Sequence, residues 1–160
     1  MTSQRRIDLE ELHNALIRAR RRGVRAPRLL DYAPDLIEML YPAEQHPNLD
    51  DDERAQATEN LIKAAVDSIG GDVGHALALT LCLPPGTLGL TLEQRRQRAA
   101  EHLGIDPHTW ERGWREPRLV RDLVYEIYQL HRTNPTAYLP ASNPPYVDEP
   151  DSGSSAPRAG

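Results

Sequence analysis

The sequence contains no phenylalanine and few aromatic residues of any kind, with two tryptophans and six tyrosines in 160 residues. Sheet-rich folds build their cores from β-branched and aromatic side chains, so this shortage argues against a β-sandwich and favours packed helices. The apolar fraction is 39%, and Leu, Ile, Val and Ala supply most of it. A chain of this length predicts one domain with a tail.

The sequence also has only one cysteine, Cys82, which excludes a disulfide framework within one chain. It lies in the apolar run 76–83, among leucines and alanines. A lone cysteine in such surroundings behaves as a small buried hydrophobe. We therefore expect no catalytic role for Cys82.

Long apolar runs are absent, and none approaches the roughly 20 residues that a membrane-spanning helix needs. The N-terminus carries Arg5 and Arg6, but acidic residues from Asp8 onward stand where the apolar part of a signal peptide would begin. These absences predict a cytoplasmic protein that does not contact a membrane.

Charge is distributed unevenly along the chain, whose formal net charge is −5. Residues 1–30 carry eight arginines and three acidic residues, whereas residues 31–60 carry one arginine and nine acidic residues. Residues 91–118 hold six arginines and five acidic residues. Phosphate contacts supply much of the affinity of nucleic-acid binders, so a basic binding surface on this chain can only be local.

Apolar residues recur at helical spacing along most of the chain. Gly23, Pro42 and Gly70 are placed to end helices. We predict an all-α fold, a compact bundle of about six short helices. The expected helical segments lie near residues 8–21, 34–41, 51–69, 73–83, 92–103, 107–115 and 117–132.

The composition changes from Thr133 onward, where residues 133–160 hold six of the 14 prolines and few large aliphatic residues. Such a segment buries too little apolar surface to offset the entropy of ordering. We predict a helical domain over residues 1–132 and a disordered, proline-rich tail over residues 133–160. A short docking peptide formed by Pro140, Pro144, Pro145 and Tyr146 is the alternative to a mere tail.

Two helix starts are marked clearly between residues 91 and 107. Thr91 and Gln94 have the spacing of a capping box, in which each side chain bonds the backbone amide of the other residue. Asp106 is placed to cap the next helix, and Pro107 suits its first position.

The turn between these two helices has a recognisable spacing. Ala100 is followed four residues later by Gly104, then by Ile105 and, after Asp106-Pro107, by Thr109. This pattern resembles the helix-turn-helix module of bacterial DNA-binding proteins, which here would cover residues 91–116. In such a module Ala100 lets the helices approach, and Gly104 takes a left-handed conformation that a Cβ would disfavour.

The resemblance implies that the second helix, residues 107–115, lies in the DNA major groove. There, arginine can pair with guanine and glutamate can accept from cytosine, while arginines elsewhere hold phosphates. The candidate base contacts are His108, Glu111, Arg112 and Arg115. The candidate phosphate contacts are Arg95, Arg96, Arg98, Arg18, Arg20, Arg21, Arg22 and Arg25.

Two features depart from this pattern. The second helix is interrupted at Gly113 and Pro117, and it carries Trp110 and Trp114 four residues apart. We expect both tryptophans in the core, because indole rings bury a large apolar area. Helical corners with the same turn also occur in proteins that never touch DNA, so an architectural corner is the alternative.

A wider stretch, residues 90–123, together with an arginine-rich composition in which Lys63 is the only lysine, resembles small uncharacterised helical proteins of high-GC actinobacteria. That resemblance implies a regulatory or adaptor part of a larger signalling system. It assigns no role to any residue.

Signals for enzymatic chemistry are missing. The six histidines show no metal-ligand spacing, and no Ser/His/Asp or Cys/His motif appears. The acidic residues 50–53 lack the pattern of a calcium loop and are explained by stabilisation of a helix N-terminus. We expect no metal, no cofactor and no enzymatic activity. Two functions stay open: a DNA-binding regulator acting as a homodimer, and a protein-protein interaction module or adaptor without a nucleic-acid role.

Overall fold

The computed structural model describes residues 6–111 and 115–141, and these residues form eight α-helices with no strand among them. The predicted all-α fold is confirmed. The helices are α1 (Leu9–Arg20), α2 (Ala26–Tyr32), α3 (Pro34–Leu40), α4 (Asp51–Ile69), α5 (Gly71–Thr80), α6 (Leu92–Leu103), α7 (Pro107–Glu111) and α8 (Arg115–Thr133), with short 3-10 helices η1 (Pro85–Thr87) and η2 (Pro135–Tyr138).

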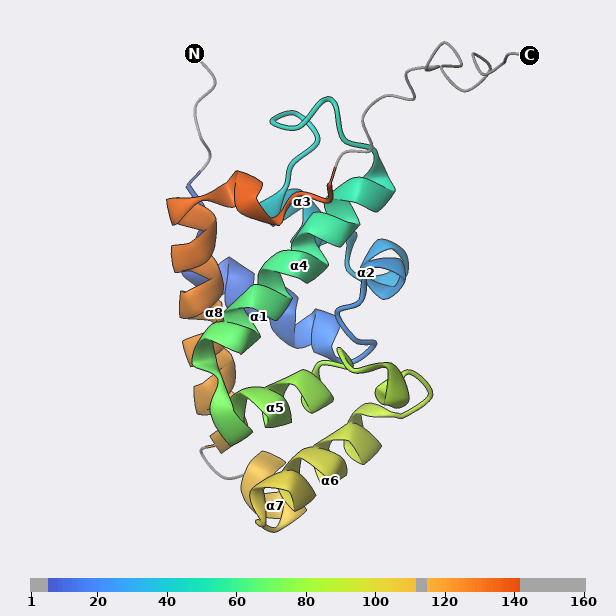
Figure 1. Ribbon diagram of the computed structural model, residues 1–160, viewed down its shortest axis with the longest axis vertical. Coiled ribbons are helices and arrows are strands. Elements are labelled where there is room, and N and C mark those ends of the chain that lie inside the picture. The colour runs from blue at the N-terminus through green and yellow to red at the C-terminus, as the bar shows by residue number, and fades with distance from the viewer. Residues whose placement is uncertain (1–5, 112–114, 142–160) are drawn as a thin grey trace, which may run out of the picture.

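The helix α4 occupies the middle of the molecule and contacts α2, α3, α5 and α8 (Figure 1). Its N-terminus is closed by a capping box, in which Glu53 N donates to Asp50 Oδ1 at 2.7 Å and Asp50 N donates to Glu53 Oε1 at 3.2 Å. The acidic run therefore stabilises a helix start, as expected. In Figure 1, α8 lies along one side of α4, and α5, α6 and α7 form the lower end of the molecule.

The main core consists of aliphatic side chains that helical spacing directs inward, among them Leu12, Leu16, Leu61 and Leu123, all fully buried. Burying each such side chain contributes about 1.5–3 kcal/mol. Cys82 is buried at 3% exposure, as expected for a small hydrophobe. Within the described residues, no helix combines the length and the apolar content needed to cross a bilayer.

The helices differ from the sequence-based prediction in number and in several of their ends, including those of α5, which covers Gly71–Thr80 where 73–83 was expected. The helix α2 was not predicted, because a seven-residue helix gives too short an apolar pattern. The described part of the helix expected over residues 107–115 is α7, Pro107–Glu111, with residues 112–114 outside the described part of the chain, and the helix expected from 117 begins at Arg115. Glu116 and Pro117 therefore lie in the first turn of α8 and break no helix, because a first-turn residue needs no amide N–H.

The start of the predicted tail is folded. The helix α8 ends at Thr133 and η2 follows directly. Tyr41 Oη donates to Pro135 O at 2.9 Å, and Asn60 Nδ2 donates to Tyr138 O at 3.0 Å. Partners that lie far away in the sequence thus hold residues 133–141 against the domain. The rest of the predicted tail, residues 142–160, lies outside the described residues.

Candidate nucleic-acid interface

The corner between α6 and α7 has the local conformations that the sequence predicts. Gln94 N donates to Thr91 Oγ1 at 3.2 Å, and Thr91 N donates to Gln94 Oε1 at 2.9 Å, which completes the capping box. Gly104 ends α6 in the left-handed region, with φ 68° and ψ 31°. Asp106 Oδ1 accepts from His108 N at 2.8 Å at the start of α7.

The inside of the corner is filled by Trp110. Its side chain is fully buried, in a small cluster with Ala76, Ala99 and Ala100. The expectation of a core tryptophan is confirmed at this position, and Trp114 lies outside the described residues. Among the other described side chains of α7, those of Pro107, His108 and Thr109 are exposed.

The four candidate base contacts do not share one helix. His108 is exposed at the start of α7, whereas Arg115 is half-buried at the start of α8. Arg112 and the side chain of Glu111 lie outside the described part of the chain. Within the described residues, the predicted recognition helix over residues 107–115 is represented by α7, Pro107–Glu111, and by Arg115 at the start of α8.

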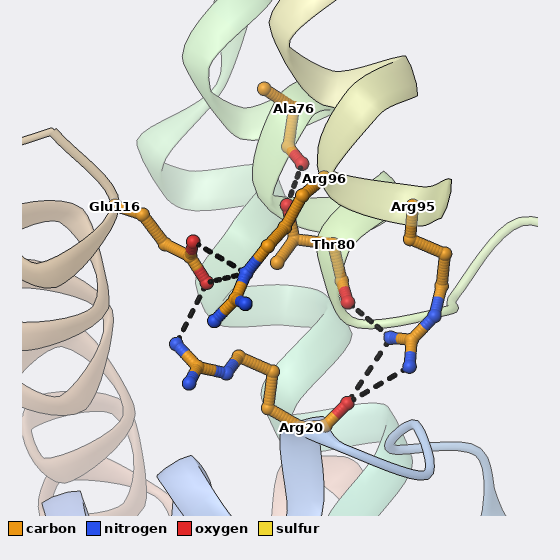
Figure 2. A network of polar contacts seen from close by, with 6 residues as sticks. All are labelled: Arg20, Ala76, Thr80, Arg95, Arg96 and Glu116. Atoms are coloured by element: carbon orange, nitrogen blue, oxygen red, sulfur yellow. Dashed lines mark hydrogen bonds and ion pairs between the residues drawn. The ribbon is translucent and has the colours of Figure 1, made fainter. Parts of the chain in front are cut away.

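Arg95, a candidate phosphate contact, lies in the interior with 1% of its surface exposed. Its guanidinium donates to Arg20 O at 3.1 Å and to Thr80 O (Figure 2). It also donates to Arg21 O at 2.8 Å. These carbonyls lie at the C-terminal ends of α1 and α5, where backbone oxygens lack intrahelical donors and carry the negative end of the helix dipole.

Arg95 therefore holds α6 against the ends of two other helices. Desolvation lowers the pKa of Arg95, and the neighbouring positive charges of Arg20, Arg96 and Arg28 add to this lowering. A guanidinium enclosed in this way faces no solvent. The assignment of Arg95 to a phosphate contact is corrected for this reason.

A buried carboxylate, Glu116, binds two further candidate phosphate contacts. Glu116 is 1% exposed and accepts from Arg20 Nη1 at 2.7 Å and from Arg96 Nε at 2.9 Å (Figure 2). The side chains of Arg20 and Arg96 are themselves only 15% and 16% exposed. This triad joins α8 to α1 and α6. No local pattern predicts this triad, because the Glu-Pro pair indicates a helix end.

Two arginines near the end of α1 contact neighbouring helices at the surface. Arg18 Nη2 lies 2.6 Å from Asp35 Oδ2 of α3 in an exposed ion pair. The guanidinium carbon of Arg22 lies 4.6 Å from the ring centroid of Tyr32, a cation-π geometry.

Of the last three candidate phosphate contacts, one is partly buried and two are exposed. Arg25 Nη1 donates to Leu83 O at 2.9 Å, and its Nε lies 3.9 Å from Glu59 Oε1. Arg21 and Arg98 are exposed. The exposed basic residues of the predicted interface are thus fewer than the sequence suggested.

The structure also brings together two histidines that the sequence separates. The rings of His75 in α5 and His102 in α6 lie 4.2 Å apart, and His102 Nε2 lies 3.3 Å from Asp72 Oδ1. Among the residues described, no group of three or more His, Cys, Asp or Glu side chains is placed to hold a metal ion. Comparisons with protein-family models, with curated protein sequences and with solved structures found no match.

Proposed function

We propose that this chain is a protein-interaction module, an adaptor without catalytic activity, in which the α6–α7 corner is part of the scaffold. The proposal rests on the contacts of three arginines beside the corner. Glu116 binds Arg20 and Arg96, and carbonyls at helix ends bind Arg95. DNA binding draws its sequence-independent affinity from basic side chains that reach phosphates. Guanidiniums held inside the fold do not supply that affinity.

The surface of the corner supports the same proposal. The Trp110 side chain of α7 is fully buried. Exposed carboxylates of Glu101 and Asp106 lie on the two sides of the Gly104 turn. Carboxylates at the turn repel a phosphate backbone, whereas they do not oppose binding of a protein.

DNA binding is the second candidate function, and one observation favours it. The left-handed Gly104, the buried Ala100 and the exposed start of α7 agree with the helix-turn-helix resemblance. On this alternative the chain acts as a dimer, and His108, Glu111, Arg112 and Arg115 read bases.

The experiment that separates the two functions is binding to mixed genomic DNA fragments, measured by fluorescence anisotropy at low and moderate salt. We expect no binding. The variant Arg112→Ala/Arg115→Ala removes the candidate base contacts, and Arg121→Ala/Arg132→Ala removes the same charge from exposed positions of α8. Salt-sensitive binding that only the first variant abolishes would reject the scaffold proposal and establish a DNA-contacting corner.

A further inference from the structure

Few contacts hold residues 134–141, here called the C-terminal segment, against the helical domain. None of the four residues of η2 is buried. Tyr41 Oη donates to Pro135 O at 2.9 Å, and this bond ties the start of the segment to the end of α3. Asn60 Nδ2 of α4 donates to Tyr138 O at 3.0 Å. A segment with so little buried surface opens at a lower free energy than the whole domain.

Tyr41 links this segment to two histidines. Its side chain is fully buried. The ring centroid of His46, in the loop after α3, lies 5.4 Å from that of Tyr41, and the centroid of His131, in the last turn of α8, lies 5.5 Å from it. His131 Nε2 also lies 2.6 Å from Leu40 O. The tyrosine that holds Pro135 is therefore the one on which both imidazoles pack.

The charged and titratable groups around this tyrosine come from α3, α4 and η2. Arg54 of α4 is 9% exposed and donates to Tyr41 O at 3.2 Å. It forms ion pairs with Glu38 of α3 at 3.0 Å and with Asp51 at 2.5 Å. The two carboxylates are 56% and 79% exposed, so water screens their charge more than that of Arg54. Tyr138 faces Tyr41 from η2 and raises its pKa after desolvation.

Burial opposes protonation of both histidines. Desolvation is the main cause that lowers the pKa of His46, followed by the positive charge of Arg54. Desolvation also lowers the pKa of His131; the hydrogen bond to the Leu40 carbonyl opposes part of this lowering, and the charge of His46 adds to it. A proton therefore binds more tightly when water reaches these rings. Opening the segment that lies against the Tyr41 hydroxyl gives water this access.

We propose that the C-terminal segment is a pH-sensitive latch, in which protonation of His46 and His131 releases residues 134–141 from Tyr41 while the helical domain stays folded. A proton that binds the open state more tightly shifts the population toward that state. Histidine is the side chain whose charge changes between about pH 5 and 8. The latch does not depend on whether the chain is an interaction module or a DNA-binding protein.

The test is amide hydrogen exchange of the full chain at about pH 7.5 and 5.5, with each rate divided by the intrinsic rate at that pH. The amides of Ala137 and Leu139 donate to carbonyls within the segment and report its opening. We expect their protection to fall by roughly tenfold or more at the lower pH, because two histidines contribute to the coupling. Amides at the centre of α4 should keep their protection.

Two double variants assign the effect to the histidines on Tyr41. His46→Gln/His131→Gln should abolish the loss of protection at low pH. The matched control His75→Gln/His102→Gln removes two exposed histidines from α5 and α6 and should show the wild-type loss. Equal protection of the wild-type segment at both pH values would overturn the latch. An equal loss in α4 would also overturn it, because the whole domain would then be opening.

A converse measurement leaves both histidines in place. Asn60→Ala removes the hydrogen bond to Tyr138 O and favours the open segment. Coupling between two equilibria is reciprocal, so imidazole NMR titration should show a higher pKa of His131 in Asn60→Ala than in wild type. Asn14→Ala, at an exposed position of α1, should leave that pKa unchanged. The same pKa of His131 in wild type and in Asn60→Ala would overturn the coupling between segment and histidine.

Discussion

Arg96 Nε lies 2.9 Å from Glu116 Oε2, a contact that joins α6 to the first turn of α8. The same carboxylate also binds Arg20 of α1. Arg95, the neighbour of Arg96, reaches the terminal carbonyls of α1 and α5. Two consecutive arginines of α6 therefore fix the orientation of the corner relative to three other helices.

These contacts explain why an arginine-rich sequence gives an uncertain guide to DNA binding. Arginine carries five donors in a rigid planar group, which suits it equally to phosphates and to carbonyls at helix ends. In this chain the positions of Arg95 and Arg96 in α6 decide between the two roles, because helical spacing directs both toward the interior.

We predict that Glu116→Gln destabilises the fold strongly. The substitution removes the buried carboxylate that binds the guanidiniums of Arg20 and Arg96, and removing one member of a buried ion pair costs about 3–5 kcal/mol. The free energy of unfolding in urea measures the effect. The control Glu93→Gln removes an exposed carboxylate from the first turn of α6 and should change stability by about 0.5 kcal/mol or less. Equal effects of the two substitutions would reject a structural role for Glu116.

Arg95→Met should lower the free energy of unfolding by about 2–3 kcal/mol, because three helix-terminal carbonyls, one buried and two part-buried, lose their charged donor. Methionine keeps a long unbranched side chain, so the loss reports on hydrogen bonds more than on packing. Arg98→Met is the matched substitution at an exposed position of the same helix and should be nearly neutral. If Arg95 were a surface ligand for phosphate, both variants would be equally stable.

Local signals allowed parts of this fold to be predicted closely. The helices α4 and α6 begin and end at the predicted residues, because Asp50 and Thr91 cap their starts and Gly70 and Gly104 follow their ends. Such signals involve residues within one or two turns of the helix terminus. These capping signals can therefore be recognised from the spacing of residues in the sequence.

The features that were not predicted depend on contacts between residues far apart in the sequence. Glu116 and Arg20 lie 96 positions apart, so no local pattern pairs them. The folded segment 133–141 likewise depends on hydrogen bonds from Tyr41 and Asn60. These two residues lie too far away in the sequence for a local pattern to predict the contacts. At the corner, the helix caps and the left-handed turn were predicted correctly from local spacing. The burial of the arginines was not predicted, because it depends on how the helices pack.

The turn itself can be tested through Gly104. Its φ of +68° is a left-handed conformation that costs a residue with a Cβ about 1–2 kcal/mol. An added Cβ meets nothing within 4 Å, so backbone conformation alone sets the expected loss in Gly104→Ala. Gly86→Ala is the control, since that position is equally open and has no positive φ in the left-handed range. Urea unfolding should show a loss for Gly104→Ala only.

The contact of His131 with the end of α3 predicts a pH-dependent stability. His131 Nε2 lies 2.6 Å from Leu40 O, and its ring packs edge-on against the buried Tyr41 at 5.5 Å. Desolvation lowers the pKa of His131 from its ordinary 6.5, and a hydrogen bond to the Leu40 carbonyl opposes part of this lowering. His46, on the same tyrosine, also has a lowered pKa, through desolvation and then the positive charge of Arg54.

A lowered pKa in the folded state means that the unfolded chain binds more protons near and below pH 6.5. The contribution of neutral His131 to the free energy of unfolding is therefore complete at pH values above the ordinary histidine pKa. This contribution is lost as the pH falls through that pKa toward the lowered pKa of the folded state. Urea unfolding between about pH 7.5 and 5 should show this decline, and His131→Gln should make it shallower. His108→Gln, at an exposed position of α7, should retain the wild-type slope. An unchanged slope in His131→Gln would show that the acid sensitivity arises elsewhere.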